Sequence, residues 1–383
     1  MSGEYDPTRC DLCGAAEFDT LPTPAAVRSL RSDGVILPRR LWKVRCRGCG
    51  LVRDGHPVGE LNAVYAADYT PAPADYTFHT PAGPLRRSAA FADWLGEAFA
   101  VPDGGRVLEV GAGAGALLAE LQERFPRARL EGVELSERAA AEARSRGRAV
   151  RAGGTAGYSP SAFDAVYSIA VLEHVPSPTA FLFELHRLLV PGGTLLLAQP
   201  TQDVPSTDVL FADHLHHFAT AHVERLGAKA GFAQVRQWVG HRWMPNFSLH
   251  LFCKTEPSDP PVVVDETTCG ESLRELTAAM RRLDDLLTRL AGRRVAVFGL
   301  GEVYSIARAY SALDSFPLAC GLLDGPPPPV PFPVVPPERA GEFGVTDVLL
   351  AVNAVHVPHA AARLAQLNVT THPILTGEAD PCS

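Results

Sequence analysis

Lysine is almost absent from this chain. Only Lys43, Lys229 and Lys254 occur, so nearly all of the 35 basic residues are arginines, and 43 acidic residues outnumber them. The formal net charge of −8 gives no bulk attraction to nucleic acid or to an anionic membrane surface. The composition therefore argues against both as partners.

Long apolar runs are also absent. No stretch approaches the roughly 20 apolar residues that a membrane-spanning helix needs, and the first ten residues, MSGEYDPTRC, do not have the composition of a secretory signal. We therefore expect a cytoplasmic protein. A chain of 383 residues is long for one hydrophobic core, so two or three domains are expected.

Four of the eight cysteines form two short pairs, Cys10-x-x-Cys13 and Cys46-x-x-Cys49. In a cytosolic chain this spacing favours a metal over disulfides. Four thiolates suit tetrahedral Zn²⁺ with every coordination position filled, which is the arrangement of a structural site. We expect these four cysteines to bind zinc; two redox-active dithiols are the alternative.

A glycine-rich turn follows a short apolar run in the stretch RVLEVGAGAGALL. Residues 107–110 are typical of a buried parallel strand, and a helical pattern starts after Gly115. A strand, a glycine turn and a helix in this order present a helix N-terminus to a ligand. The glycines also fit a dinucleotide fingerprint, which is a weak signal by itself.

Three features favour S-adenosylmethionine over a dinucleotide. Glu109 precedes the first glycine by two residues, where a carboxylate would repel a pyrophosphate but attract the ammonium group of an amino acid. Glu134 ends the next strand, where a carboxylate can accept both ribose hydroxyls. The stretch LVPGGTLLLA at 189–198 is typical of class I methyltransferases. The residues expected at the cofactor are Glu109, Gly111, Ala112, Gly113, Gly115, Glu134, Leu135 and Ser168.

Strand and helix patterns alternate regularly through the middle of the chain, which predicts a doubly wound parallel sheet of the α/β class. Strands are expected near 106–110, 129–134, 164–169 and 194–198, and helices near 115–125, 136–146, 178–190 and 220–230. Two further strands, near 234–239 and 247–254, have no helix between them. They predict an antiparallel hairpin that closes the sheet.

A second α/β pattern follows a stretch at 256–262 that is rich in proline and aspartate. A long helix is expected over 273–290, and RVAVFGLG at 294–301 repeats the order of strand and glycine turn. Eight prolines within 325–337 exclude regular structure there. We predict three parts: a zinc-binding module with a lid segment at 1–80, a class I methyltransferase domain at 81–256 and a smaller Rossmann-like domain at 257–383.

Histidines gather at two places where the substrate of such a fold is expected, beyond the carboxyl ends of the strands. His174 follows the strand near 164–169, and Asp213, His214 and His217 lie together further along the chain. Histidine can take up a proton near neutral pH, and a neighbouring carboxylate can fix its tautomer. The cluster predicts acid–base chemistry; a metal site in the Asp-His-x-His-His run is an alternative.

Together the motifs resemble those of the sugar C-methyltransferases of deoxysugar biosynthesis, over nearly the whole chain. The resemblance is carried by the two cysteine pairs and by residues 64–69, 172–175, 213–218, 297–299 and 350–353. It implies an S-adenosylmethionine-dependent C-methyltransferase of antibiotic biosynthesis, with structural zinc and a nucleotide-linked keto-deoxysugar as substrate.

The resemblance also implies a mechanism. A base removes a proton from the carbon next to a ketone, and the resulting enolate carbon attacks the activated methyl group. His214 is expected as the base, oriented by Asp213, with His174 at the ketone oxygen and His217 beside them. The sequence does not decide which of His214 and His174 is the base and which lies at the ketone oxygen.

Other positions are expected at the substrate or depart from the family pattern. Tyr76 and His79 lie in an aromatic stretch that is either a lid or ordinary packing, and Asn353 matches a marker of the C-terminal domain. Phe211 replaces a family tyrosine, which removes a donor that could polarise a ketone. The alternatives are an O- or N-methyltransferase acting on another small metabolite, an NAD-linked oxidoreductase and a zinc-anchored interaction protein. A monomer or weak homodimer is expected.

Overall fold

The computed structural model describes residues 5–56, 77–80, 83–99, 101–264, 267–325 and 328–375. Contacts divide the chain into two compact units, Met1–Leu21 with Trp42–Gly270 and Pro22–Leu41 with Glu271–Ser383. Most of the stretch between the two cysteine pairs thus belongs to the second unit. The division into three consecutive ranges stays a prediction.

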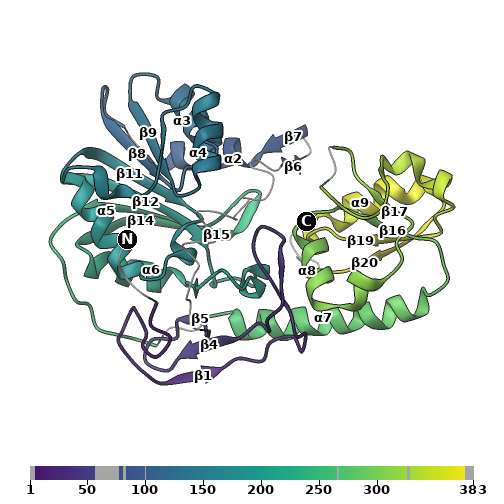
Figure 1. Cartoon of the computed structure of the whole chain (residues 1–383). Helices are drawn as coiled ribbons and strands as arrows, with labels where there is room; N and C mark the ends of the chain where they lie inside the picture. The colour runs from purple at the N-terminus through teal and green to yellow at the C-terminus, as the bar shows by residue number, and fades with distance from the viewer. Residues whose placement is uncertain are drawn as a thin grey trace. The chain divides into compact units, whose positions relative to one another are not determined.

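A seven-stranded mixed sheet forms the centre of the first unit (Figure 1). Its strands, in sheet order, are β10 (Val150–Ala152), β9 (Arg129–Glu134), β8 (Arg106–Val110), β11 (Phe163–Ile169), β12 (Leu189–Pro200), β15 (Met244–Lys254) and β14 (Phe232–His241). The first five are parallel, and β15 and β14 pair antiparallel at one edge. The predicted class I sheet and its closing hairpin are confirmed.

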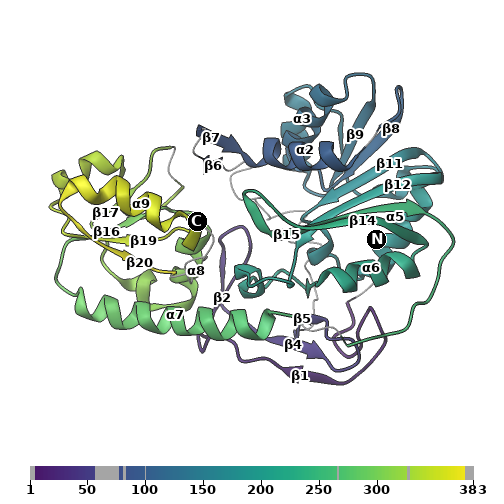
Figure 2. The same ribbon diagram turned by 180° about the vertical axis from the view of Figure 1, so that it is seen from behind.

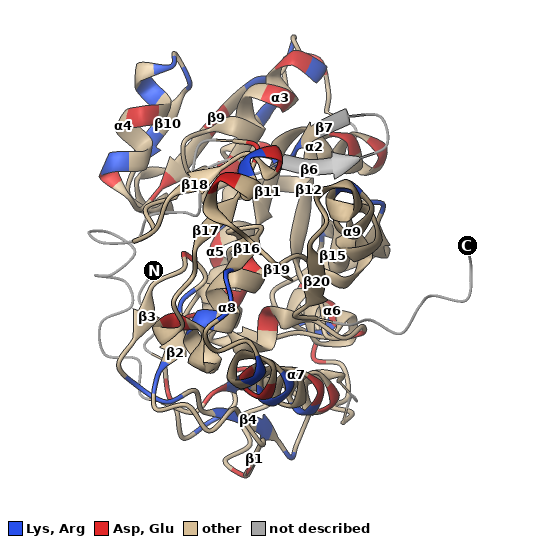
Figure 3. Cartoon of the chain, turned by 90° about the vertical axis from the view of Figure 1, so that its right-hand side faces the viewer, with Lys and Arg blue, Asp and Glu red and all other residues tan. Residues whose placement is uncertain are grey.

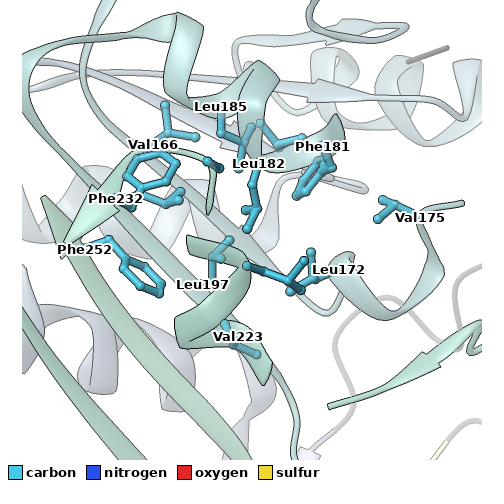
Figure 4. Close-up of a cluster of buried hydrophobic side chains, with 14 of the residues drawn as sticks. Val166, Leu172, Val175, Phe181, Leu182, Leu185, Leu197, Val223, Phe232 and Phe252 are labelled. Atoms are coloured by element: carbon cyan, nitrogen blue, oxygen red, sulfur yellow. The ribbon is translucent and has the colours of Figure 1, made fainter. Parts of the chain in front are cut away.

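Helices cover both faces of this sheet. They are α2 (Arg87–Ala98), α3 (Ala116–Arg124), α4 (Glu137–Ser145), α5 (Pro178–Leu188) and α6 (Thr220–Lys229). Alternate residues of β12 serve the two faces: Leu195 and Leu197 pack in a cluster with α5 and α6, whereas Leu196 and Ala198 pack in a cluster with α2, α3 and α4. Figure 4 shows the first of these clusters.

Side-chain caps mark the starts of two of these helices, and the boundaries that the sequence misplaced have a local cause. Ser136 and Ser177 cap α4 and α5 by accepting backbone N–H groups. The sequence missed β10, which has only three residues. It also started the strand at 194, because Pro191-Gly192-Gly193 looks like a turn; β12 begins at Leu189, and the register with β11 shifts around this stretch.

A second, four-stranded antiparallel sheet in the first unit joins distant parts of the chain. Its order is β1 (Phe18–Thr20), β4 (Lys43–Cys46), β5 (Val52–Asp54) and β13 (His216–His217). Three strands come from the cysteine region, and the fourth comes from the histidine cluster. A short hairpin, β6 (Thr77–Thr80) with β7 (Gly83–Arg86), precedes α2.

The second unit contains a five-stranded parallel sheet, as the C-terminal pattern predicts. Its order is β18 (Val334–Val335), β17 (Cys320–Leu322), β16 (Val295–Phe298), β19 (Asp347–Leu350) and β20 (Thr370–Pro373). The expectation that 325–337 has no regular structure is wrong at β18, because a proline carbonyl can still accept: Pro333 O accepts the N–H of Gly321. In Figure 2, α9 (Val357–Leu364) lies on one side of this sheet, and α7 (Cys269–Arg289) and α8 (Glu302–Tyr310) lie on the other.

Residues from the N-terminal region complete the second unit. The hairpin of β2 (Ser29–Leu30) and β3 (Ile36–Leu37) packs near α8, where Arg28 donates to the backbone carbonyls of Arg308, Ala309 and Ser311. Figure 3 shows that acidic and basic residues both occur along α7. No helix among the described residues combines the length and apolarity needed to cross a membrane.

Candidate functional site

The glycine turn after β8 has the backbone that its sequence requires. Gly111, Gly113 and Gly115 all have positive φ angles, of 85°, 52° and 70°. The N–H groups of Gly111 and Ala112 both donate to Val133 O, at 2.9 and 3.0 Å. A Cβ on Gly111 would lie 2.3 Å from Cγ2 of Val171, so the turn packs closely on the segment that leads to His174.

Glu134 closes this turn from the neighbouring strand. Its Oε2 accepts the N–H of Gly113 and its Oε1 accepts that of Ser136, each at 2.8 Å. Each carboxylate oxygen has a second lone pair, so both can still accept ribose hydroxyls. Leu135, next in the chain, is 37% exposed and offers an apolar surface beside the carboxylate.

Glu109 lies deeper in the same unit. It is 3% exposed and accepts a hydrogen bond from Tyr167 Oη at 3.1 Å. Burial raises the pKa of Glu109 to about 8, so a bound cation would favour its ionised form. Ser168, also expected at the cofactor, donates its hydroxyl to Val110 O at 2.9 Å and thereby ties β11 to β8.

The histidine cluster is organised by Asp208, which the sequence analysis missed. Asp208 lies in the short 3₁₀ helix Thr207–Leu210, and its two carboxylate oxygens contact Nδ1 of His214 and Nδ1 of His217, the second at 2.6 Å. Gln202 Nε2 donates to the same carboxylate at 2.9 Å. Asp208 therefore takes the orienting position that adjacency in sequence assigned to Asp213.

Asp213 lies at His174 instead. Its backbone carbonyl is 3.0 Å from His174 Nδ1, and its Oδ2 is 3.8 Å from the same nitrogen. The rings of His174 and His214 are perpendicular, with centroids 4.5 Å apart. Phe211 packs against His214 with ring centroids 5.0 Å apart, so the residue that replaces the family tyrosine lies within this cluster.

These contacts determine the tautomers of the two central histidines. Carbonyl and carboxylate oxygens only accept, so Nδ1 carries a proton in both rings. In a neutral His174 the Nε2 atom is then a proton acceptor. In a protonated His214 the Nε2 atom is a proton donor.

The pKa values of the two rings move in opposite directions. Burial, with the neighbouring His214 charge, lowers the pKa of His174 to about 4. Burial would also lower the pKa of His214, but the Asp208 carboxylate outweighs it and raises that pKa to about 9. Near pH 7 the site therefore contains one neutral imidazole and one imidazolium.

His217 is the second histidine held by the Asp208 carboxylate. Its side chain is 0% exposed, and its Nε2 has no hydrogen-bond partner within the described residues. Burial lowers the pKa of His217 to about 4, so it donates to Asp208 as a neutral ring. The enclosed ring contacts Asp208, and the catalytic role expected for His217 stays a prediction.

Glu173 is a second residue that the sequence analysis passed over. It is 2% exposed, its Oε2 has no partner in the described part of the chain, and burial raises its pKa to about 7. Ligand atoms of Glu173, His174 and His214 lie within 4.8 Å of one another. A metal bound here would have to displace the proton of His214, whose pKa is raised by Asp208.

The four cysteines of the two pairs come together. Sγ of Cys10 is 3.6 Å from Sγ of Cys49, Sγ of Cys13 is 3.5 Å from Sγ of Cys46, and all four lie within 4.8 Å of one another. A disulfide requires about 2.05 Å, whereas bonds of about 2.3 Å to one tetrahedral zinc place sulfurs about 3.8 Å apart. The observed cluster fits the metal.

The structure does not test the three predicted substrate residues. Tyr76 lies outside the described residues, and His79 is placed in β6 without a description of its side chain. Asn353 is exposed in the second unit, just before the 3₁₀ turn Ala354–His356. Their roles stay predictions.

Known proteins resemble the middle of this chain. Residues 85–250 match the family model of a methyltransferase domain. The ubiquinone biosynthesis O-methyltransferase of Dechloromonas aromatica is 33% identical to this chain over 115 residues, and that of Xanthomonas campestris pv. campestris is 36% identical over 115 residues. Each match covers 28% of this chain. The matches cover 48% of the first protein and 47% of the second. The chain thus spans about half the length of the curated relatives it matches.

Solved structures with a similar fold include the putative methyltransferase in complex with the Haloferax volcanii Trm112 activator (18% identity, TM-score 0.40, 45% of this chain and 91% of that one). Another is geranyl diphosphate C-methyltransferase from Streptomyces coelicolor A3(2), at 16% identity and TM-score 0.38, with 44% and 76% coverage. From the domain match and the observed sheet, the chain contains a methyltransferase domain with the class I S-adenosylmethionine methyltransferase fold.

Proposed function

We propose that this protein transfers the methyl group of S-adenosylmethionine to a carbon next to a ketone, with a nucleotide-linked keto-deoxysugar as acceptor. S-adenosylmethionine supplies an already activated methyl group, so the protein must position it and generate the carbon nucleophile. The observation that carries the proposal is the pair His174 and His214, one neutral and one protonated; the segment that leads to His174 packs on the glycine turn through Val171. The choice of sugar rests on the sequence resemblance.

The hydrogen bonds favour an order of roles opposite to the one first expected. Nε2 of the neutral His174 takes the proton from the carbon, while the imidazolium of His214 donates from Nε2 to the oxygen that becomes negative. The C–H electron pair forms the enolate, whose carbon then bonds to the methyl group as the methyl–sulfur bond breaks. Asp208 keeps His214 charged throughout.

The contacts around the glycine turn suggest a role for each of three cofactor residues. Glu134 is suited to the ribose hydroxyls, Glu109 to the positive end of the ligand, and Gly111 to close backbone approach. The cysteine cluster is suited to one structural zinc ion.

Gly111→Ala should weaken binding of S-adenosylhomocysteine by about tenfold or more, because the added Cβ would be strained at positive φ and would collide with Val171. Titration calorimetry measures the affinity directly. Gly104→Ala is a matched control, since Gly104 also has positive φ but open space around it, before the start of β8. Equal affinities for the two variants would remove the glycine turn from the cofactor site.

C-methylation predicts exchange of a carbon-bound proton. In D₂O with S-adenosylhomocysteine, the protein should incorporate deuterium next to the ketone of a nucleotide-linked 4-keto-deoxysugar, and His174→Gln should abolish the exchange while S-adenosylhomocysteine still binds. Mass spectrometry and proton NMR of the sugar report the result. Exchange at the wild-type rate in His174→Gln would exclude His174 as the base.

O-methylation is the second candidate, because the curated relatives are named as O-methyltransferases. A histidine base can also remove a hydroxyl proton. Transfer of a methyl group to a hydroxyl of a small metabolite, with no deuterium incorporated at carbon, would favour this candidate.

A further inference from the structure

The loop that carries the histidines is held by the cysteine region. We define the histidine loop as residues 211–217. Its end forms β13, in which His216 and His217 pair with Arg53 and Val52 of β5. The N–H of Asp54 also donates to Leu215 O at 3.0 Å, and the N–H of Leu215 donates to Glu173 O at 2.8 Å. Backbone hydrogen bonds thus connect β5, the histidine loop and the segment that bears His174.

One side chain reaches the middle of this loop. Lys43, in β4, is 0% exposed, and its Nζ donates to Phe211 O at 2.8 Å and to His214 O at 2.9 Å. Asp54 Oδ2, 3.8 Å from Nζ, supplies the compensating charge. The lysine therefore fixes the spacing of two carbonyls three residues apart, one of them belonging to His214.

Burying an ammonium group costs desolvation free energy, and an apolar residue of similar volume often stabilises a fold equally well or better. The three donors of an ammonium group are useful where several carbonyls must be held in one place. We propose that Lys43 is a positioning residue that holds the histidine loop in the geometry in which His214 meets Asp208 and His174. This inference takes the catalytic role of the histidines from the proposed function, but its test needs no substrate.

The experiment compares Lys43→Met with Lys229→Met in the full, metal-loaded chain. Lys229 is the matched control because it also joins the cysteine region to the methyltransferase domain, through Nζ to Leu12 O at 2.7 Å, without contacting the histidine loop. Hydrogen exchange of peptides covering 208–218 should be about tenfold faster or more in Lys43→Met and unchanged in Lys229→Met. In Lys43→Met the His214 imidazole, followed by NMR, should titrate closer to the ordinary histidine range.

Binding of S-adenosylhomocysteine should stay within about twofold in both variants, because the glycine turn is not in the loop. Unchanged exchange and unchanged His214 titration in Lys43→Met would overturn the inference. If Lys43→Met fails to bind S-adenosylhomocysteine, the variant Lys43→Gln decides, because it keeps two N–H donors without the charge. An intermediate effect on the loop supports positioning. Loss of binding in this variant too shows a general folding role and overturns the inference. Failure of deuterium exchange in the wild type would reject the proposed chemistry but leave these readouts intact.

Discussion

Asp208→Asn should lower turnover by about 10²- to 10⁴-fold while leaving S-adenosylhomocysteine affinity nearly unchanged. Asparagine keeps the shape of the side chain but removes the charge that raises the pKa of His214. His214 would then be neutral at pH 8 and would stabilise a developing oxyanion poorly. Steady-state kinetics with the acceptor found by deuterium exchange measure the effect.

The pH dependence tests whether activity requires a neutral His174 and a protonated His214. If His174 is the base and His214 the donor, kcat/KM rises as His174 loses its proton near pH 4 and falls as His214 loses its proton near pH 9. Asp208→Asn should move the alkaline fall to lower pH, because the pKa of His214 drops. A kcat/KM that instead climbs up to about pH 9 would assign the base to His214.

Asp203→Asn provides the control for this substitution. Asp203 is five residues earlier, and its Oδ2 accepts the N–H of Thr220 at the start of α6 at 2.9 Å. Its loss should cost about 1 kcal/mol of stability but leave the pH profile unchanged. A similar shift of the profile in both variants would show that the effect is not specific to the carboxylate at His214.

Loss of the metal should have the largest effect on stability. Cys10, Cys46 and Cys49 are buried in the same hydrophobic cluster as Leu182 and Leu226 of the methyltransferase domain, so the effect will not be confined to the first fifty residues. Structural zinc contributes about 10–16 kcal/mol of apparent binding free energy near pH 7 in small domains. Cys46→Ser, or removal of zinc by a chelator, should lower the unfolding midpoint by about 10–20 °C or more, as expected for a loss of about 5 kcal/mol.

Calorimetry and metal analysis check this result. The wild type should contain one zinc per chain, and Cys46→Ser should contain none. Cys253→Ser is the matched control, because Cys253 lies in β15 and is not part of the four-cysteine group. A metal-free protein with a wild-type melting temperature would exclude a structural role for the cysteine cluster.

Much of the architecture could be predicted because its signals are local. The alternation of strand and helix patterns predicted the central sheet of the first unit and the parallel sheet of the second. Gly111, Gly113 and Gly115 indicated the turn, since positive φ is strongly selected for glycine. The spacing of the four cysteines indicated their cluster in the same way.

The partners of the histidines could not be predicted, because proximity in sequence is a poor guide to side-chain direction in an irregular loop. Asp213 is adjacent to His214, but its backbone carbonyl and carboxylate lie at His174. Asp208 contacts His214 from the 3₁₀ helix Thr207–Leu210, of which it is part. Nothing in the sequence indicated that Glu173 and His217 are buried. The sequence alone therefore could not distinguish a structural role from a catalytic one for either residue.

By itself, the sequence determined the kinds of structure present: a glycine turn at a helix N-terminus, a cluster of four cysteines and two sheets with helices between their strands. Only the tertiary structure decided which groups act together. The pairing of β5 with β13 brings residues about 160 positions apart into one sheet, and Lys43 reaches from that region to the carbonyl of His214. Burial beside Asp208 or away from it then leaves one imidazole protonated and the other neutral, because electrostatic free energy depends on distance and desolvation rather than on order in the chain.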